Sequence, residues 1–274
     1  MGRAFSALLL ATLLAGCKDD DPSYDGRLSD LASELVVSVE VIGTPNPATP
    51  RRILVTLDPG PSATRDQDNL CAVVEAQASV NGLALEQTQK GDYFYTGGGI
   101  LSGYSGCYPI TFERALPEEL PPELLEELTR VQVRDESGVV LVEARGLFQS
   151  VRATFVEPAD GVMTPGDLVS LAVEPSPEML PWRLSGYYRA DVPGDSFGLG
   201  EIEINETGIQ FHVFERAVAS SGAIKFSSDS GGPFRGIVDT CQGAARCSAA
   251  RTSGVTYSDG FDSLVLPASV AAEN

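Results

Sequence analysis

Apolar and polar residues alternate along most of the chain with a period of two. Residues 35–41, 53–58 and 74–80 are three clear examples, with an apolar side chain at every second position. Because successive side chains of a β-strand point to opposite faces, each segment predicts a strand with one buried face. Turn dipeptides lie between such runs: Asn81-Gly82, Lys90-Gly91 and Ser137-Gly138. These dipeptides are typical of hairpins, so the pattern predicts an all-β fold.

One segment departs from this alternation. Residues 117–130 read PEELPPELLEELTR, with Pro121 and Pro122 ahead of a run rich in leucine and glutamate. Proline is tolerated in the first turn of a helix, acidic residues are favourable there, and the leucines form a stripe at helical spacing. We therefore expect one short helix here, crossing between strands.

Two short sequence matches indicate an internal repeat. Leu54-Val55-Thr56-Leu57 recurs as Leu168-Val169-Ser170-Leu171, and Phe112-Glu113-Arg114-Ala115 recurs unchanged at 214–217. The matches come in the same order at offsets of roughly 100–115 residues, which is the length of a domain and not of a solenoid unit. A duplicated domain is the favoured interpretation, and chance similarity of short peptides is the alternative.

About seven short strands in about 110 residues are typical of an immunoglobulin-like sandwich. The segment 155–167, with its Pro158 and Pro165-Gly166 turns, also resembles the first strand and turn of bacterial immunoglobulin-like domains. We therefore expect two tandem immunoglobulin-like β-sandwiches, at residues 31–147 and 148–266, followed by a tail over 267–274.

The N-terminus has the pattern of an export signal. Met1-Gly2-Arg3 precedes an apolar run that ends in Leu14-Ala15-Gly16-Cys17, and the run is too short to span a bilayer, which needs about 20 residues. This ending resembles the lipobox of bacterial lipoproteins. The resemblance implies a signal peptide over residues 1–16, cleavage before Cys17, and acyl chains on Cys17 that anchor the chain stably in a membrane. An ordinary secreted protein with a chance cysteine is the alternative.

Residues 17–30 are polar and begin with Lys18 and three aspartates. This composition predicts a solvated tether. The acidic run resembles the surface-export signal of some Bacteroidetes lipoproteins, and lysine directly after the cysteine resembles the export signal of myxobacterial lipoproteins. Arginine is far commoner than lysine in the chain, which suits a GC-rich genome and favours the myxobacterial type. Either resemblance implies the bacterial cell envelope, at the outer membrane or the cell surface.

The chain is strongly acidic, with a formal net charge of −19 and a pI near 4.3. This charge repels phosphate backbones, so we expect no nucleic-acid partner. The expected partners are the membrane, through the anchor, and a protein or glycan of the envelope. A single histidine provides few ligands for a metal site, and we expect no cofactor.

Four cysteines remain once Cys17 is assigned to the anchor, and four cysteines allow three pairings. Exported proteins meet an oxidising compartment, where disulfides form by default. Proximity in the chain and the domain division favour Cys71 with Cys107 and Cys241 with Cys247. Zinc is the alternative, but no C-x-x-C spacing is present.

Two groups of residues are candidate binding sites. Asp66, Asp68 and Asn69 could offer oxygens to calcium, although the segment lacks the glycine and distal glutamate of an EF-hand loop, and an exposed acidic turn is the favoured interpretation. The lone Trp182 begins an alternating run that places Trp182 and Tyr188 inward and Tyr187 outward. Core packing is the favoured role of Trp182, and a sugar-stacking platform with Tyr187 and Tyr188 is the alternative.

Two serine motifs resemble those of hydrolases. Asp229-Ser230-Gly231-Gly232-Pro233 matches most of the run around the nucleophile of trypsin-like proteases, and residues 194–198 fit the letters of the G-x-S-x-G elbow. The first needs a distant histidine base, while the only histidine, His212, lies shortly before it. The second needs a strand before it and a helix after it, which the flanking sequence does not predict. Both motifs are interpreted as turns. Alternation places His212 outward, whereas the repeat aligns it with Ile110.

These observations favour a non-catalytic envelope lipoprotein that presents binding or adhesive β-sandwich modules. Two alternatives belong to other classes. One is an envelope hydrolase with a carboxylate site that the sequence does not reveal, and the other is a structural subunit of an envelope assembly.

Overall fold

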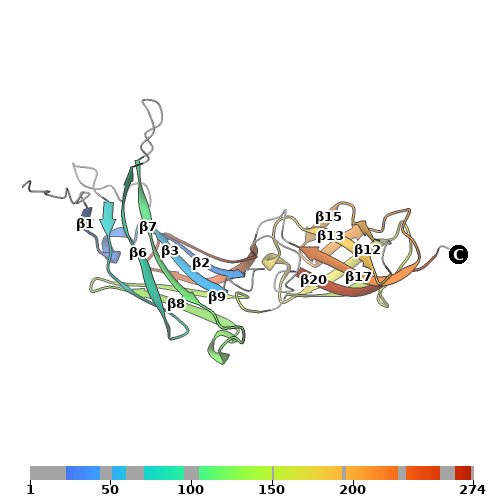
Figure 1. The fold of residues 1–274 in the computed structure, drawn as a ribbon, viewed down its shortest axis with the longest axis horizontal. Helices are drawn as coiled ribbons and strands as arrows, with labels where there is room; N and C mark the ends of the chain where they lie inside the picture. The colour runs from blue at the N-terminus through green and yellow to red at the C-terminus, as the bar shows by residue number, and fades with distance from the viewer. Residues whose placement is uncertain are drawn as a thin grey trace, which may run out of the picture.

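The structure is a computed structural model, and it describes residues 23–43, 51–59, 71–95, 105–149, 151–192, 196–227, 233–253 and 263–272. Most of these residues form β-strands, arranged as two bodies that lie end to end (Figure 1). Each body has its own hydrophobic core. In the described ranges, no helix is long and apolar enough to cross a membrane.

The first body, called the barrel below, is a closed sheet of nine strands in the order β18-β19-β2-β3-β7-β6-β5-β8-β9. Closure removes sheet edges, because β9 at one end of this order pairs with β18 at the other. The strands are β2 (Val36–Gly43), β3 (Arg52–Asp58), β5 (Gln77–Val80), β6 (Leu83–Tyr95), β7 (Ser105–Ala115), β8 (Leu128–Arg134), β9 (Val139–Arg145), β18 (Phe234–Gln242) and β19 (Arg246–Ser253).

The core of the barrel follows the predicted alternation. Every second side chain of β2 is buried, from Val37 to Val41, and the same holds for β3 from Ile53 to Leu57. The N-terminal part of the described chain closes one end of the barrel. It consists of strand β1 (Ser23–Asp25), which pairs in parallel with β4 (Cys71–Val73), and helix α1 (Leu28–Leu31).

The second body, called the sandwich below, consists of two sheets packed face to face around the second core. The four-stranded sheet contains β10 (Arg152–Glu157), β12 (Leu168–Glu174), β16 (Gly208–His212) and β15 (Ile202–Asn205), in that order. The five-stranded sheet contains β11 (Val162–Met163), β20 (Ser263–Val270), β17 (Ser220–Ser227), β13 (Ser185–Ala190) and β14 (Ser196–Gly198), in that order.

The hairpin β18–β19 connects the two bodies. In sequence it lies between β17 and β20, which are neighbours in the sandwich, but β18 pairs with β9 and β19 pairs in parallel with β2. The domain boundaries expected from the sequence put this hairpin in a second domain over 148–266, whereas its hydrogen bonds assign residues 234–253 to the barrel. The expected tail at 267–274 also differs, because β20 continues through Pro267 to Val270.

The helix expected over 117–130 is wrong. Its only helical part is a 3₁₀ turn at Pro122–Leu124, and β8 begins at Leu128. The leucines do not form one buried stripe, because Leu124 is buried while Leu125 is 58 % exposed. The short helix of the barrel is α1 instead, and it lies at the end of the expected tether. Leu28 is buried in the barrel core, so the tether expected over 17–30 is folded where the structure describes it.

Of the two sequence matches that indicate a repeat, one lies on corresponding strands and the other does not. The first match lies on equivalent strands, since β3 pairs with β7 as β12 pairs with β16. The second match does not correspond. Phe112 is buried opposite Val55, whereas Phe214 lies beyond β16 and is 52 % exposed, and the residue opposite Val169 is Phe211. The verbatim recurrence is therefore not a structural equivalence.

Two of the three predicted turn dipeptides close hairpins. Asn81 and Gly82 connect β5 to β6 with positive φ angles of 44° and 82°, as a two-residue type I′ turn requires. Ser137-Gly138 closes the β8–β9 hairpin, where the Asp135 carboxylate accepts hydrogen bonds from both backbone N–H groups. The Lys90-Gly91 prediction is wrong, because both residues lie inside β6.

Candidate functional site

Several predicted site residues lie outside the described residues. They are the lipidation residue Cys17, the calcium candidates Asp66, Asp68 and Asn69, and Ser230 of the protease-like motif. Their roles stay predictions. Among the residues that are described, no group of three or more histidine, cysteine, aspartate or glutamate side chains could hold a metal ion.

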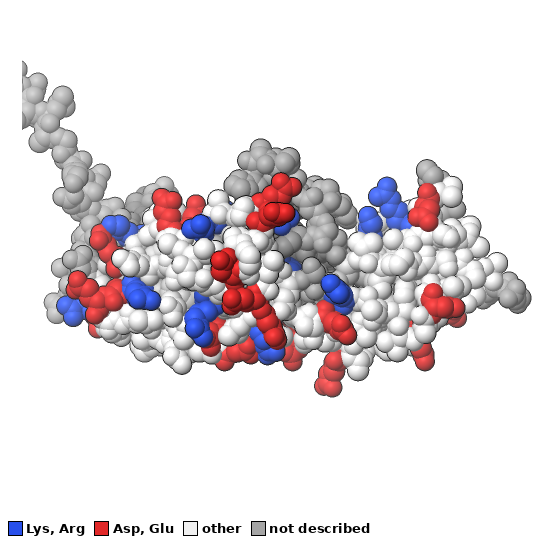
Figure 2. Space-filling view, turned by 90° about the horizontal axis from the view of Figure 1, so that it is seen from below, with Lys and Arg blue, Asp and Glu red and all other residues white. Residues whose placement is uncertain are grey.

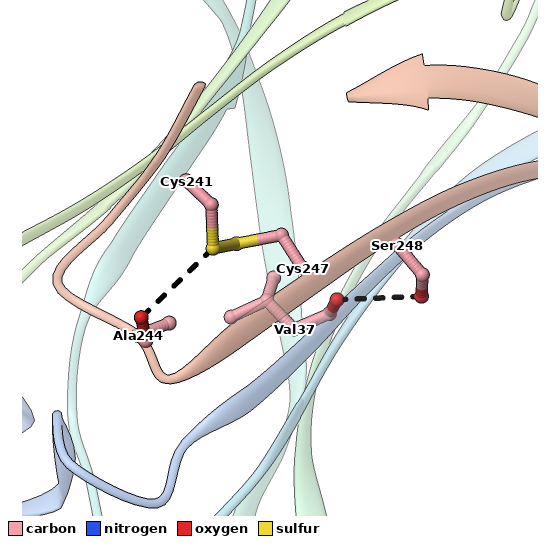
Figure 3. The surroundings of a disulfide bond; sticks show 5 residues. All are labelled: Val37, Cys241, Ala244, Cys247 and Ser248. Atoms are coloured by element: carbon pink, nitrogen blue, oxygen red, sulfur yellow. Dashed lines mark hydrogen bonds between the residues drawn. A yellow bond between two sulfur atoms is a disulfide. The ribbon is translucent and has the colours of Figure 1, made fainter. Parts of the chain in front are cut away.

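Both expected disulfides are present, joining Cys71 to Cys107 and Cys241 to Cys247. The second closes the tip of the β18–β19 hairpin beside β2 (Figure 3). The Cys241 Sγ lies 3.9 Å from the Ala244 carbonyl oxygen. Where β19 runs beside β2, the Ser248 hydroxyl donates a hydrogen bond of 3.5 Å to the Val37 carbonyl oxygen (Figure 3).

The three aromatic candidates do not form one platform. Trp182 lies before β13 starts, is 62 % exposed, and has the Arg183 guanidinium 4.4 Å from its ring centroid. The expected core role of Trp182 is therefore wrong. Tyr188 is fully buried, stacks on Phe197 at 4.9 Å, and donates a hydrogen bond to the Ser220 carbonyl at 2.7 Å. Only Tyr187 lies on the outer face of the five-stranded sheet.

The serine and histidine candidates lie on different sheets. Ser196 is exposed on β14 at the edge of the five-stranded sheet, where it pairs with Arg189. His212 is exposed on β16 in the four-stranded sheet, and its Nδ1 lies 3.4 Å from the Gly166 carbonyl oxygen. Packed sheets are about 10 Å apart, so the imidazole cannot take a proton from the Ser196 hydroxyl. His212 is exposed, as the alternation pattern predicts. The repeat alignment, which matches His212 with the buried Ile110, is wrong at this position.

The outer face of the five-stranded sheet presents a distinct arrangement. We call it the outer sheet face and define it by Tyr187, Arg189, Lys225, Val265 and Pro267. Tyr187 on β13 is opposite Lys225 on β17, which is opposite Val265 on β20. In the next row, Arg189 is opposite Ala223, which is opposite Pro267. On the other side of β13 the neighbours are Gly198 and Ser196 of β14.

The burial pattern confirms the direction of these side chains. On β13, Tyr188 and Ala190 are buried, so Tyr187 and Arg189 point to solvent. On β17, Ile224 and Phe226 are buried on either side of Lys225. The face therefore carries one aromatic ring and two cations; Arg189 is exposed, and Tyr187 and Lys225 are half-buried.

The two cations of the outer sheet face differ from four of the barrel cations in their ion pairing. In the described part of the chain, neither Arg189 nor Lys225 makes an ion pair. Four described barrel cations do make ion pairs; the pairs are Arg52–Glu113, Lys90–Glu75, Arg130–Glu143 and Arg145–Asp239. Figure 2 accordingly shows acidic and basic side chains intermixed over the barrel.

Two of these contacts have electrostatic consequences on β9. A hydrogen bond from the Thr240 hydroxyl, followed by one from Arg130, lowers the pKa of Glu143. The hydrogen bonds from Arg145 to Asp239 at 2.8 and 2.9 Å raise the pKa of the arginine. Because Asp239 and Thr240 are on β18 and their partners are on β9, these contacts attach the hairpin to the barrel.

Part of this arrangement could be recognised in the sequence. The alternation over 182–189 places Tyr187 and Arg189 outward together, as observed. Lys225 could not be added, because alternation gives the face of a residue and not the strand register that sets it opposite Tyr187.

Comparisons with known proteins give little support for an identity. No family model matches, and no curated protein matches. One solved structure, a chimeric titin Z1Z2 functionalized with a KLER exogenous peptide from decorin, aligns over 82 % of this chain and 99 % of its own, with 11 % identity and a TM-score of 0.19. A similarity this weak does not define the fold.

Proposed function

We propose that this chain is a non-catalytic, lipid-anchored protein of the bacterial cell envelope that binds a partner through its sandwich. Its architecture would be two immunoglobulin-like modules behind a lipidated Cys17. The outer sheet face is the observation that carries the binding role.

The strand order supports an immunoglobulin-like sandwich. One sheet of that fold has the order A-B-E-D and the other contains G-F-C. The order β10-β12-β16-β15 corresponds to the first sheet, and β20-β17-β13 corresponds to the second. For the barrel, the support is that β3 pairs with β7 as β12 pairs with β16 in the sandwich. The barrel departs from the immunoglobulin pattern because the hairpin β18–β19 is inserted between β9 and β2 and closes the sheet.

Two features support presentation away from a membrane. The lipobox-like Leu14–Cys17 precedes β1 by a few residues, and β1 lies at the end of the barrel opposite the sandwich (Figure 1). A membrane anchor at Cys17 would then leave the outer sheet face distant from the anchored end.

The outer sheet face supports binding because neither Arg189 nor Lys225 has an ion-pair partner among the described residues. A partner that supplies the opposite charge would therefore gain electrostatic contacts there without breaking any of the described ion pairs. In a chain with net charge −19, such a face is also selective. It attracts an anionic partner locally while the rest of the protein repels bulk polyanions.

The test separates anchoring from binding. The full chain with Cys17→Ser should appear in the soluble fraction, whereas the unaltered chain should fractionate with membranes and carry acyl mass. The soluble variant should then bind isolated envelopes of the source bacterium saturably. Membrane fractionation of the Cys17→Ser variant would contradict the anchor, and absence of saturable binding would contradict the binding role.

A further inference from the structure

We infer that the Cys241–Cys247 disulfide is a thiol–disulfide exchange site that accepts electrons from a protein dithiol, and that its reduction loosens the barrel between β18 and β19. The site lies in the barrel, and its chemistry is separate from the binding role proposed for the sandwich.

The two arms of the β18–β19 hairpin pair with each other over a short stretch only. Phe234–Gly236 pairs with Ala249–Arg251. From Ile237 to Gln242, β18 pairs with β9 instead, while β19 pairs with β2 along its whole length. Within 233–253, which the structure describes throughout, no strand pairing joins the arms beyond Gly236. We call this unpaired stretch, from Ile237 to the turn at 243–245, the seam, and the disulfide is the covalent bond that crosses it.

Each arm keeps its own attachments to the barrel if the disulfide is opened. β19 pairs with β2 in eight rows, and β18 pairs with β9 in five. The Thr240 hydroxyl donates a hydrogen bond to Glu143 on β9, and the Ala245 N–H of the turn donates one of 2.9 Å to the Leu35 carbonyl. Reduction therefore frees the arms to move apart at the seam without unfolding either strand, as a reversible site requires.

The two disulfides of the barrel differ in their accessibility to a reductant. Exchange begins when a thiolate reaches one of the two sulfur atoms. Cys241 is exposed and Cys247 is half-buried, whereas Cys71 is fully buried and its partner Cys107 is half-buried. The Cys241–Cys247 loop, with six positions between its cysteines, also constrains the unfolded chain less than the loop of 36, so its opening costs the fold less.

The exchange transfers two electrons and two protons. A thiolate of the dithiol attacks the Cys241 Sγ, the S–S bond breaks, and Cys247 leaves as a thiolate that takes up a proton. The second thiol of the reductant then attacks the reductant sulfur of the mixed disulfide, which releases Cys241 as a thiol. The dithiol leaves as a disulfide, having lost the two protons and two electrons that the cysteines gain. An oxidised partner of the same class restores the bond by the reverse steps.

Opening of the seam affects the adjacent edge of the barrel core. Cys247 packs against that core and is opposite Val37 on β2. Cys241 is opposite Val142 on β9. Both valines are buried, so movement of the arms loosens the packing over β2 and β9. The reduced state is therefore distinguishable from the oxidised one by the protection of these two strands.

The experiment uses the full chain with Cys17→Ser, both disulfides intact, and reduced thioredoxin as the probe, without denaturant. New thiols are trapped with iodoacetamide at timed intervals and mapped by mass spectrometry. Cys241 and Cys247 should be alkylated at least about tenfold faster than Cys71 and Cys107, because reduction at the buried Cys71 needs a local opening of the barrel first.

The matched control is the variant with Cys241→Ser and Cys247→Ser, in which the seam is permanently open. Hydrogen exchange in peptides of β2 and β9 should accelerate in the selectively reduced chain as it does in this variant, and glutathione disulfide should restore the slow exchange. Equal rates of reduction at the two disulfides would overturn the inference, as would unchanged exchange of β2 and β9 in the reduced chain. Neither readout depends on envelope binding, so these outcomes leave the proposed function intact.

Discussion

The disulfide at the tip of the inserted hairpin should stabilise the barrel, although both of its cysteines follow most of the sandwich in sequence. The perturbation is the double substitution Cys241→Ser and Cys247→Ser. These cysteines are six positions apart, and closing a loop of that length in the unfolded chain corresponds to about 2 kcal/mol in the loop-entropy model. The free energy of unfolding should fall by about that amount.

The loss should be confined to strands that contact the hairpin. Cys247 on β19 is paired with Val37 on β2, and Cys241 on β18 is opposite Val142 on β9. Hydrogen exchange, followed by mass spectrometry, should therefore accelerate in peptides that cover β2 and β9. Peptides that cover β12 and β16 of the four-stranded sheet should exchange at the rate of the unaltered chain.

The matched control is Cys71→Ser with Cys107→Ser, which opens the other disulfide of the barrel. Its cysteines are 36 positions apart, so the same model gives a loss of about 4 kcal/mol. The reasoning is refuted if the hairpin variant accelerates exchange in β12 and β16 while β2 and β9 keep their protection. That result would mean that the hairpin belongs energetically to the sandwich.

Three further predictions concern single side chains. Gly208→Ala should lower the free energy of unfolding by about 3 kcal/mol or more, because φ is 152° and a Cβ would lie 1.9 Å from the Leu171 carbonyl oxygen. Gly166→Ala, at φ 89° with no atom within 4 Å, should lower it by about 1 kcal/mol. Equal losses in thermal unfolding would contradict this reasoning. Tyr188→Phe should cost about 1 kcal/mol in denaturant titration, because it removes a hydrogen bond of 2.7 Å. Burial raises the pKa of Asp135, but hydrogen bonds from Leu28, Ser137 and Gly138 outweigh it and lower the pKa overall; the stabilisation is therefore present above the unfolded-state pKa and is lost as the pH falls through the folded-state value. The stability gap between the unaltered chain and Asp135→Asn should narrow in acid, and a gap that is constant with pH would contradict the reasoning.

Alternation predicted strands well where one face is buried and the other is solvated. It assigned the correct faces to β2, β3 and β5, because in each of them the period of two in the sequence coincides with the alternation of buried and solvated side chains. It failed for Trp182, which continues the pattern of β13 in sequence but lies before the first residue of that strand. A periodic pattern gives no information on where a strand begins.

The insertion of the hairpin could not be predicted for a related reason. The burial pattern of β18 alternates poorly, since its ladder with β9 has an irregularity between Val238 and Thr240. The strand also changes partner, pairing with β19 over Phe234–Gly236 and with β9 from Ile237 onward. Its place is set by contacts with residues about a hundred positions earlier, and no local feature of the sequence encodes that distance.

The inserted hairpin changes how the two bodies are joined. A tandem pair of domains has one covalent crossing, but this chain crosses between barrel and sandwich after β9, after β17 and before β20. A contact between the two bodies adds to these crossings. Met179, which lies between β12 and β13 of the sandwich, packs directly on Gly146, which follows β9 of the barrel, and a Cβ added to Gly146 would lie 2.1 Å from the Met179 Cε. β17 and β20 pair along eight residues, while β18 and β19, which lie between them in the chain, pair with β9 and β2 of the barrel. Separating the two bodies therefore requires breaking the pairing of the hairpin with the barrel or the pairing of β17 with β20, and not only straightening a linker.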